Sequence, residues 1–365
     1  MLFFKVSAFY FFYFATIGVY IIFLPKVLQN LSYTPYEIGI IFALAPLMRF
    51  LTPFLFLKHI KLNQNSFKIA LFVIFITASL FYITIYDFYL FLITNAILGA
   101  ALSLILPYIE IIALKNIGKE RYGKSRLFGS IGFMAIALIL ARLLDDSIIA
   151  LHFYLILSIL TIVSSLILLK YDENEEISSS SDDSFSIVKY FTFWVSLFFM
   201  QVSFGGFYNF FTIYTTDSGI SLEMASFLWS FGVLCEIIML YFQGGLLKKN
   251  ILLLIKISIF LTIIRWLLVY LYPDHLTMLF LSQSIHAFSF GLYHSAIIVY
   301  LYSMYSNKKL AQQFMFGIAY GLGGFVGAFV AGVLYGEYLF LYSALFALFA
   351  FIALLMHKKP ISSSI

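Results

Sequence analysis

The chain has 365 residues, of which 63% are hydrophobic and only 11% are charged, and its mean hydropathy is +1.01. Soluble domains average about 25% charged residues, so this composition excludes a soluble globular protein and indicates a polytopic membrane protein. The formal net charge is +5. Cys235 is the only cysteine, which excludes an intrachain disulfide and a cysteine-rich metal site.

Apolar stretches long enough to cross a membrane as a helix, which takes ~20 residues, recur along the chain. The first has no basic leader followed by a small-residue cleavage site, so we expect a retained helix and not a signal peptide. Six stretches cover about residues 2–24, 37–57, 67–86, 88–114, 126–145 and 149–169. A polar, serine-rich stretch at 171–188 then predicts a mobile linker. Six more cover about residues 190–214, 222–246, 251–271, 276–303, 312–335 and 338–356.

Positive charges on the connecting segments predict the orientation of these helices. With the N-terminus in the cytoplasm, nearly all lysines and arginines of the loops fall on the inner side, and little beyond Lys26 and Arg142 falls on the outer side. Because positively charged loops are retained in the cytoplasm, both termini are expected inside. The basic pI is then a consequence of topology, and no nucleic-acid partner is expected.

The order of elements predicts an all-α membrane protein with twelve transmembrane helices. We expect a six-helix bundle at residues 1–170, a cytoplasmic linker at 171–188 and a second six-helix bundle at 189–365. Two similar bundles of this kind commonly place a binding site between them.

Ionisable residues interrupt the apolar stretches in both halves. Glu110 and Arg126 lie in the first half, and Glu236, Arg265 and His286 lie in the second. One ionisable side chain at the bilayer centre costs at least roughly 2.5 to 3.5 kcal/mol. Several together predict buried charge clusters around a polar cavity, and therefore transport and not anchoring.

Glu110, deep in the fourth stretch, is the expected partner of Arg126, which opens the fifth. An arginine offers a planar fork of donors to a carboxylate or to a substrate oxygen. Two alternatives stay open: an ion pair that only fixes helix packing, and an arginine that extends from the helix end toward water.

Further polar residues suit the same cavity. His286 and His294 are eight residues apart, about 80° around a helix of 3.6 residues per turn, so both can face one space. Histidine is a natural proton carrier, although a hydrogen-bonded core residue is the alternative. Arg49 lies between Pro46 and Pro53 in the second stretch; pairing, binding of a substrate anion, gating and packing stay open for it.

Small residues recur on the eleventh stretch, where they predict close helix packing or rocking. They are Gly317, Gly321, Gly324, Gly327, Ala328, Ala331 and Gly332. No hydrolytic or nucleotide-binding motif is present, and two histidines without further ligands do not predict zinc. We expect no catalytic residues, no metal and no cofactor.

These segments resemble the major facilitator superfamily, and within it the phenylpropionate permease family, with lactose permease and nucleoside symporters as more distant relatives. The resemblance spans essentially the whole chain. It rests on Phe11-Phe12-Tyr13-Phe14 with Gly18, Tyr20 and Pro25, on Gly39 to Ala43 with Arg49, on Tyr122 to Ser130, on Arg265-Trp266, on Gln283 to His294, and on Gly323-Gly324 to Tyr335.

Similarity to lactose permease implies roles for the charged residues. Glu110 and Arg126 stand at its substrate-binding pair, and Glu236 stands at its affinity and coupling acid. Arg265 and His286 match its proton-translocation network. Ser289, however, stands where that family has the carboxylate that carries the proton. Proton coupling would then use Glu236, His286 or Glu110, with Arg265 tuning their acidity because a cation favours a carboxylate and disfavours an imidazolium.

The resulting hypothesis is a monomeric secondary transporter of the bacterial inner membrane. It takes up a small organic solute with protons by alternating access, and an aromatic acid is the favoured solute, with a sugar or a nucleoside as alternatives. Glu110, Arg126, Glu236 and Arg49 would bind substrate, while Glu236, Arg265, His286 and His294 would handle protons. An uncoupled facilitator or an efflux transporter is the first alternative, and a membrane-embedded enzyme or receptor is a distant one.

Overall fold

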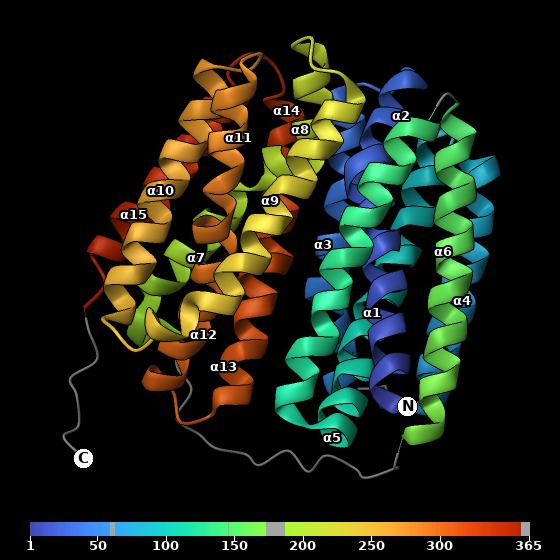
Figure 1. The fold of residues 1–365 in the computed structure, drawn as a ribbon, viewed down its shortest axis with the longest axis horizontal. Helices are drawn as coiled ribbons and strands as arrows, with labels where there is room; N and C mark the ends of the chain where they lie inside the picture. Colours follow the sequence, from blue (N-terminus) through green and yellow to red (C-terminus); the bar gives the residue numbers. More distant parts are fainter. Residues whose placement is uncertain (59–62, 145, 173–186, 359–365) are drawn as a thin grey trace.

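The computed structural model describes residues 1–58, 63–144, 146–172 and 187–358, without the side chains of 53–58, 119, 120 and 309. Within these ranges eleven helical segments are long and apolar enough to cross a membrane. The twelfth helix, Leu339–Leu355, is apolar and 17 residues long. The predicted all-α membrane protein of twelve helices is therefore confirmed (Figure 1). Most of the predicted linker lies outside the described residues.

The first half of the chain contributes six spans. Their elements are α1 (Leu2–Gly18), the π-helical turn η1 (Val19–Phe23), α2 (Leu24–Asn30), α3 (Pro35–Lys58), α4 (Gln64–Thr84), α5 (Phe88–Leu143), α6 (Ser147–Leu168) and η2 (Leu169–Tyr171). The elements α1, η1 and α2 form one continuous span, Leu2–Asn30.

The second half contributes the other six. Its elements are η3 (Val188–Tyr190), α7 (Phe191–Ser203), α8 (Gly205–Asp217), α9 (Leu222–Phe242), η4 (Gln243–Gly245), α10 (Ile251–Leu271), α11 (Leu276–Ser284), η5 (Ala287–Leu292), α12 (Tyr293–Met304), α13 (Lys308–Met315), η6 (Phe316–Gly323), α14 (Gly324–Val333) and α15 (Leu339–Leu355). Two of these, η5 and η6, are π-helical turns inside a span. Such turns occur frequently at functional sites.

Short polar side chains begin many of these helices. Each accepts a hydrogen bond from a backbone N–H of the first turn, which would otherwise lack a partner. The capping residues are Asn63, Asp87, Asp146, Ser221, Asn250 and Asn307. The polar breaks between the apolar stretches therefore fix where the spans start.

The fourth and fifth spans are joined almost without a loop. Gly118 has φ 74° and ψ 162°, a conformation that glycine adopts readily, and it reverses the chain between Phe88–Gly118 and Arg121–Leu143. The helices reach further into the polar segment than the predicted spans 88–114 and 126–145. Arg126 consequently lies more than one turn inside its helix, and the expectation that it opens the span is wrong.

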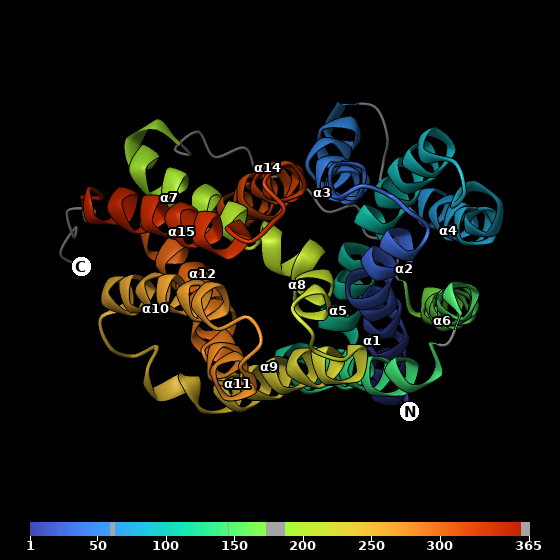
Figure 2. The same ribbon diagram turned by 90° about the horizontal axis from the view of Figure 1, so that it is seen from above.

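Each half packs mainly within itself, and the two halves meet along two seams. In the first half α1 packs against α5 and α6; in the second, α15 packs against α7 and α10. Between the halves, α3 lies against α14 and η6, and α5 lies against α9 (Figure 2). Residues that face the space between these seams are therefore contributed by both halves.

The N-terminus lies at the lower end of the molecule in Figure 1, which we call the terminal end. Among the described residues, the ion pairs that join the two halves lie at the opposite end. Lys26 Nζ is 3.8 Å from Asp217 Oδ1, and Arg142 Nε is 3.0 Å from Glu223 Oε1. Gln29 also donates to both oxygens of Asp217 at 3.1 Å. The opposite end is therefore held closed by polar contacts.

Candidate functional site

Arg265, on α10, is the centre of a buried network in the second half. Its side chain is fully buried, and its Nη1 donates to His286 Nδ1 at 2.9 Å and to Ser289 Oγ at 3.1 Å. Its Nη2 donates to Gln283 Oε1 at 3.1 Å. None of these three partners is a carboxylate, so the guanidinium charge is not neutralised by direct contact.

The contact with Arg265 fixes the protonation state of His286. A guanidinium can only donate, so Nδ1 of His286 accepts and the ring proton is on Nε2. That Nε2 lies 3.6 Å from Glu236 Oε2. A second proton could bind His286 only if the Arg265 bond were broken, because two donors would then face each other.

Aromatic rings enclose the same guanidinium. Its central carbon lies 4.2 Å from the ring centroid of Phe207, 4.5 Å from that of Trp266 and 5.6 Å from that of Phe204. Such faces stabilise a cation by their negative charge density. Nε of Arg265 and Nε2 of Gln283 are nevertheless buried without a hydrogen-bond partner in the described part of the chain. The site thus holds a cation with unused donor capacity.

Glu110 and Arg126 meet as predicted in the first half. Arg126 Nη1 lies 3.1 Å from Glu110 Oε1. Tyr122 bridges them, because its hydroxyl donates to Glu110 at 2.9 Å and accepts from Arg126 at 3.1 Å. The expectation of burial is wrong for this pair, since the side chains are 44% (Arg126) and 26% (Glu110) exposed. This partly open pair can exchange protein contacts for substrate contacts.

Arg49, on α3, is exposed and has no ion pair with any described residue. Its helix packs against α14 and η6 of the other half, and the next residue, Phe50, lies beside Gly321 of η6. This position near the seam favours a role at the interface over a purely local packing role.

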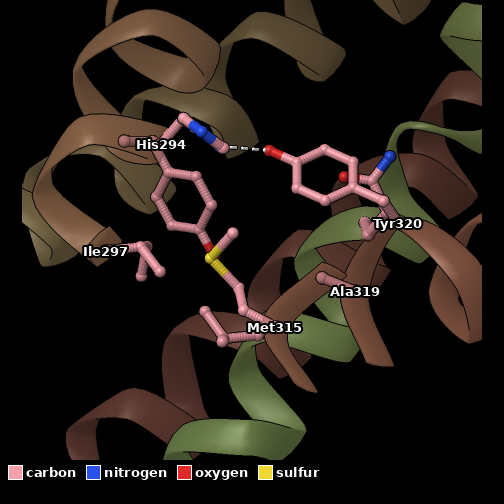
Figure 3. A pocket seen from close by; sticks show the side chains of 8 residues that line it. His294, Ile297, Met315, Ala319 and Tyr320 are labelled. Carbon is pink, nitrogen blue, oxygen red and sulfur yellow. Dashed lines mark hydrogen bonds between the residues drawn. The ribbon is translucent and has the colours of Figure 1, made fainter. Parts of the chain in front are cut away.

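His294, on α12, donates to or accepts from the hydroxyl of Tyr320 on η6, with 2.7 Å between Nδ1 and Oη (Figure 3). The ring of Phe290 lies between the two histidines, 5.3 Å from His286 and 6.3 Å from His294 between centroids. The π-helical turn η5 has more residues per turn than an α-helix, which brings these positions onto one face. The two histidines share a face more closely than the α-helical spacing predicts.

Tyr320 lies where the two halves meet. Its hydroxyl contacts His294, and its element η6 packs against α3 of the other half. Sequence reasoning missed this residue, although it is the large polar side chain within the small-residue stretch of the eleventh span. The glycines beside it bring α3 close: a Cβ on Gly321 would lie 2.8 Å from Phe50 Cβ.

Twelve apolar helices in two bundles, with charges from both bundles around one central region, define a membrane transporter and not an anchor or an enzyme with a surface site. Comparison with known proteins agrees. The MFS_1 like family matches residues 3–344, and the chain belongs to this family of the major facilitator superfamily.

Individual relatives are distant. The probable 3-phenylpropionic acid transporter of Escherichia coli (strain K12) is 23% identical over 347 residues, which are 89% of each chain. A crystal structure of the nucleoside transporter NupG matches with a TM-score of 0.79 at 19% identity, covering 98% of this chain and 100% of NupG. FucP in the outward conformation matches with a TM-score of 0.58 at 16% identity, covering 99% of each chain. The structural matches show the fold.

Proposed function

We propose that this major facilitator protein takes up a small monocarboxylate, with an aromatic acid of the phenylpropionate type favoured, together with protons. The observation that carries this proposal is the balance of charge among these residues of the spans. Three arginines, Arg49, Arg126 and Arg265, stand against two carboxylates, Glu110 and Glu236, so one positive charge is left over when the histidines are neutral. A bound carboxylate would neutralise this positive charge.

Electrostatics makes this excess consequential. Two unit charges 4 Å apart interact by about 4 kcal/mol at an effective dielectric constant of 20, and arginine binds carboxylates through two parallel hydrogen bonds. The partly open pair of Glu110 and Arg126 offers a polar contact for the carboxylate of an aromatic acid. The name of the Escherichia coli relative supports this substrate class.

We propose Glu236, Arg265, His286 and His294 for proton coupling. Glu236 and His286 are 3.6 Å apart, so a proton can pass between them when His286 turns from Arg265. Ser289 is fully buried and bonded to Arg265, and its hydroxyl cannot replace a titrating acid. Coupling through the remaining groups is the version of the proposal that this geometry supports.

We also propose that the terminal end faces the cytoplasm of a bacterium, in the inner membrane, and that residues 1–170 and 189–365 move as two bundles. The asymmetry of lysine and arginine supports this orientation. The closed end would then be the outer one. A substrate would enter the described conformation from the cytoplasm, or leave into it at the end of uptake.

Transport in proteoliposomes tests the proposal. The protein would be reconstituted with an imposed pH gradient. Accumulation of 3-phenylpropionate, its neutral amide, a sugar and a nucleoside would be measured with labelled solutes, and proton movement with a pH-sensitive dye inside the vesicles. We expect accumulation of the carboxylate with proton movement in the same direction. Carboxylate equilibration without proton movement would favour the uncoupled facilitator, and accumulation of the sugar or nucleoside alone would contradict the substrate class.

A further inference from the structure

Tyr122 holds both charges of the first half through one oxygen. Its hydroxyl donates to Glu110 Oε1 at 2.9 Å and accepts from Arg126 Nη1 at 3.1 Å. That Nη1 and that Oε1 lie 3.1 Å apart, but in the described part of the chain no hydrogen bond runs from Arg126 directly to Glu110. The hydroxyl is therefore the hydrogen-bond partner that the two charges share.

This arrangement differs from the strongest way to pair an arginine with a carboxylate. In that geometry, two parallel N–H groups donate to the two carboxylate oxygens. Here the hydrogen bond that Arg126 donates to a described residue starts from Nη1 and ends at Tyr122. A guanidinium has five N–H donors, and this side chain is 44% exposed. Its Nε and Nη2 are thus left for another acceptor, such as a second carboxylate.

The backbone explains why Tyr122 can reach both charges. Tyr122 and Arg126 are four residues apart on the fifth span, Arg121–Leu143, so their side chains lie on one face of the helix. Glu110 belongs to the fourth span, and the turn at Gly118 reverses the chain between the two spans. The hydroxyl therefore meets one charge along its own helix and the other across the turn.

A buried ring keeps Tyr122 in place. Tyr10, on α1, is fully buried, and its ring meets that of Tyr122 edge to face with 6.2 Å between the centroids. Edge-to-face contact is a preferred arrangement of aromatic rings, and α1 packs closely against α5. The position of the Tyr122 hydroxyl is therefore set by packing as well as by the two charges.

We propose that Tyr122 is a positioning residue, which keeps Glu110 from forming a two-point ion pair with Arg126 and so leaves the guanidinium ready for the carboxylate of a substrate. Without the hydroxyl, Glu110 loses the donor that holds Oε1 and turns both oxygens toward the guanidinium. The substrate then has to displace a stronger ion pair. This inference deepens the proposed function and rests on it, because Arg126 must bind a carboxylate.

A double-mutant cycle tests this role. The dissociation constants of 3-phenylpropionate and of its neutral amide would be measured in detergent for the unaltered protein, Tyr122→Phe, Glu110→Gln and the variant with both changes. We expect Tyr122→Phe to weaken carboxylate binding about tenfold, the order of one hydrogen bond to a charged group. The amide should bind with unchanged affinity, since it does not compete for the guanidinium.

The Glu110→Gln background separates positioning from packing. A glutamine has no charge and one side-chain oxygen, so it cannot form the two-point ion pair. In this background, removal of the Tyr122 hydroxyl should change carboxylate affinity by less than about twofold, the usual limit for independent sites. A ring needed only for packing or folding would instead weaken binding equally in both backgrounds.

Tyr108→Phe is the matched control. Tyr108 also belongs to the fourth span, is buried, and donates its hydroxyl hydrogen bond to a carboxylate, that of Asp172. Loss of this hydroxyl removes a similar hydrogen bond from the same half, but not one to Glu110. The control should bind the carboxylate within about twofold of the unaltered protein.

The outcomes separate this inference from the proposed function. Unchanged carboxylate affinity in Tyr122→Phe, or equal weakening in the two backgrounds, would overturn the inference and leave the substrate class intact. Parallel loss of amide binding in Tyr122→Phe would also overturn it, because the effect would then not depend on the carboxylate. Failure of the unaltered protein to bind any carboxylate would contradict the proposed function and overturn the inference with it.

Discussion

At the scale of single residues, the central charges divide into a buried group and an open group. Arg265 is fully buried with neutral hydrogen-bond partners, whereas Arg126 is 44% exposed and paired with Glu110. A buried guanidinium is stabilised when its surroundings supply hydrogen-bond acceptors and aromatic faces. The buried Arg265 can therefore keep its position and its electrostatic field, while Arg126 can exchange its protein partners for substrate.

Glu236→Gln tests the coupling acid. The amide keeps the size of the side chain and can still accept from His286, but it cannot release a proton, so proton-driven accumulation should be lost. Exchange of labelled for unlabelled substrate across the membrane should continue, because it requires no net proton movement. Asp274→Asn, in an exposed loop at the opposite end, is the control. Intact accumulation with an intact proton signal in Glu236→Gln would rule out the coupling role.

Sequence alone predicted some of the contacts among the charged residues but missed the tyrosines that join them. Glu110 with Arg126, and Glu236 with His286, meet as expected because charges in apolar helices need partners. The contact of Tyr320 with His294 was not predictable, since it depends on π-helical turns in two different spans. Neither leaves a clear periodic signal in a span that is apolar throughout.

At the scale of elements, the spans follow directly from apolar length and capping residues. The turn at Gly118 was harder to predict from the sequence. The polar segment that contains Lys115 and Arg121 has the composition of a loop, although most of it is helical. Helical ends extend beyond the apolar core of a span when long side chains reach water. The position of Arg126 inside its helix is a consequence of that extension.

Gly39 and Gly332 define the closest approach of α3 and α14. A Cβ on Gly39 would lie 2.7 Å from Gly332 Cα and 2.9 Å from the carbonyl oxygen of Ala328. Overpacking of this kind costs typically about 1–3 kcal/mol. Gly39→Ala should therefore weaken closure of the opposite end and lower the rate of transport, by roughly tenfold for 1.4 kcal/mol.

Gly317, in the small-residue stretch of the eleventh span, provides the control for this change. A Cβ on Gly317 would lie 3.7 Å from the nearest ring atom of Phe50, which is an ordinary contact distance. Gly317→Ala should leave the transport rate nearly unchanged. Equal rates for Gly39→Ala and the unaltered protein, measured in proteoliposomes, would show that close packing of α3 and α14 is not needed for closure.

At the scale of the whole molecule, polar contacts at the opposite end hold the two halves together. Asp217 forms an ion pair with Lys26 and accepts a hydrogen bond from Gln29, both of the first half. It also accepts a hydrogen bond from the hydroxyl of Tyr335 of the second half at 2.6 Å. Burial, and then the bond to Asp217, raise the pKa of Tyr335 well above its ordinary value, so this hydroxyl stays a donor at physiological pH. The described conformation is closed at this end.

Asp217→Asn should shift the population toward opening at the opposite end. Exposed ion pairs contribute about 0.2–1 kcal/mol each, so the open fraction should rise up to about fivefold. Spin labels on cysteines at Asn30 and Glu337, both exposed, in a Cys235→Ser background would report the distance between the halves. An unchanged distance distribution, with Asp274→Asn as the control, would show that this contact does not hold the closed state.

The central claim is that an excess positive charge at the centre of the membrane binds a substrate carboxylate. Ser289 offers the most direct test, because it is fully buried and its hydroxyl lies 3.1 Å from Arg265 Nη1. Ser289→Asp would supply the missing negative charge, and Ser289→Asn would add the same bulk without charge. If the new carboxylate and the bound substrate were about 8 Å apart, their negative charges would repel each other by about 2 kcal/mol at a dielectric constant of 20.

The measurement is the dissociation constant of 3-phenylpropionate for these two variants in detergent. The proposal predicts that Ser289→Asp binds the carboxylate at least about tenfold more weakly than Ser289→Asn, since 1.4 kcal/mol corresponds to a factor of ten, while the neutral amide does not distinguish them. Equal carboxylate affinity in the two variants, or tighter binding by Ser289→Asp, would contradict it.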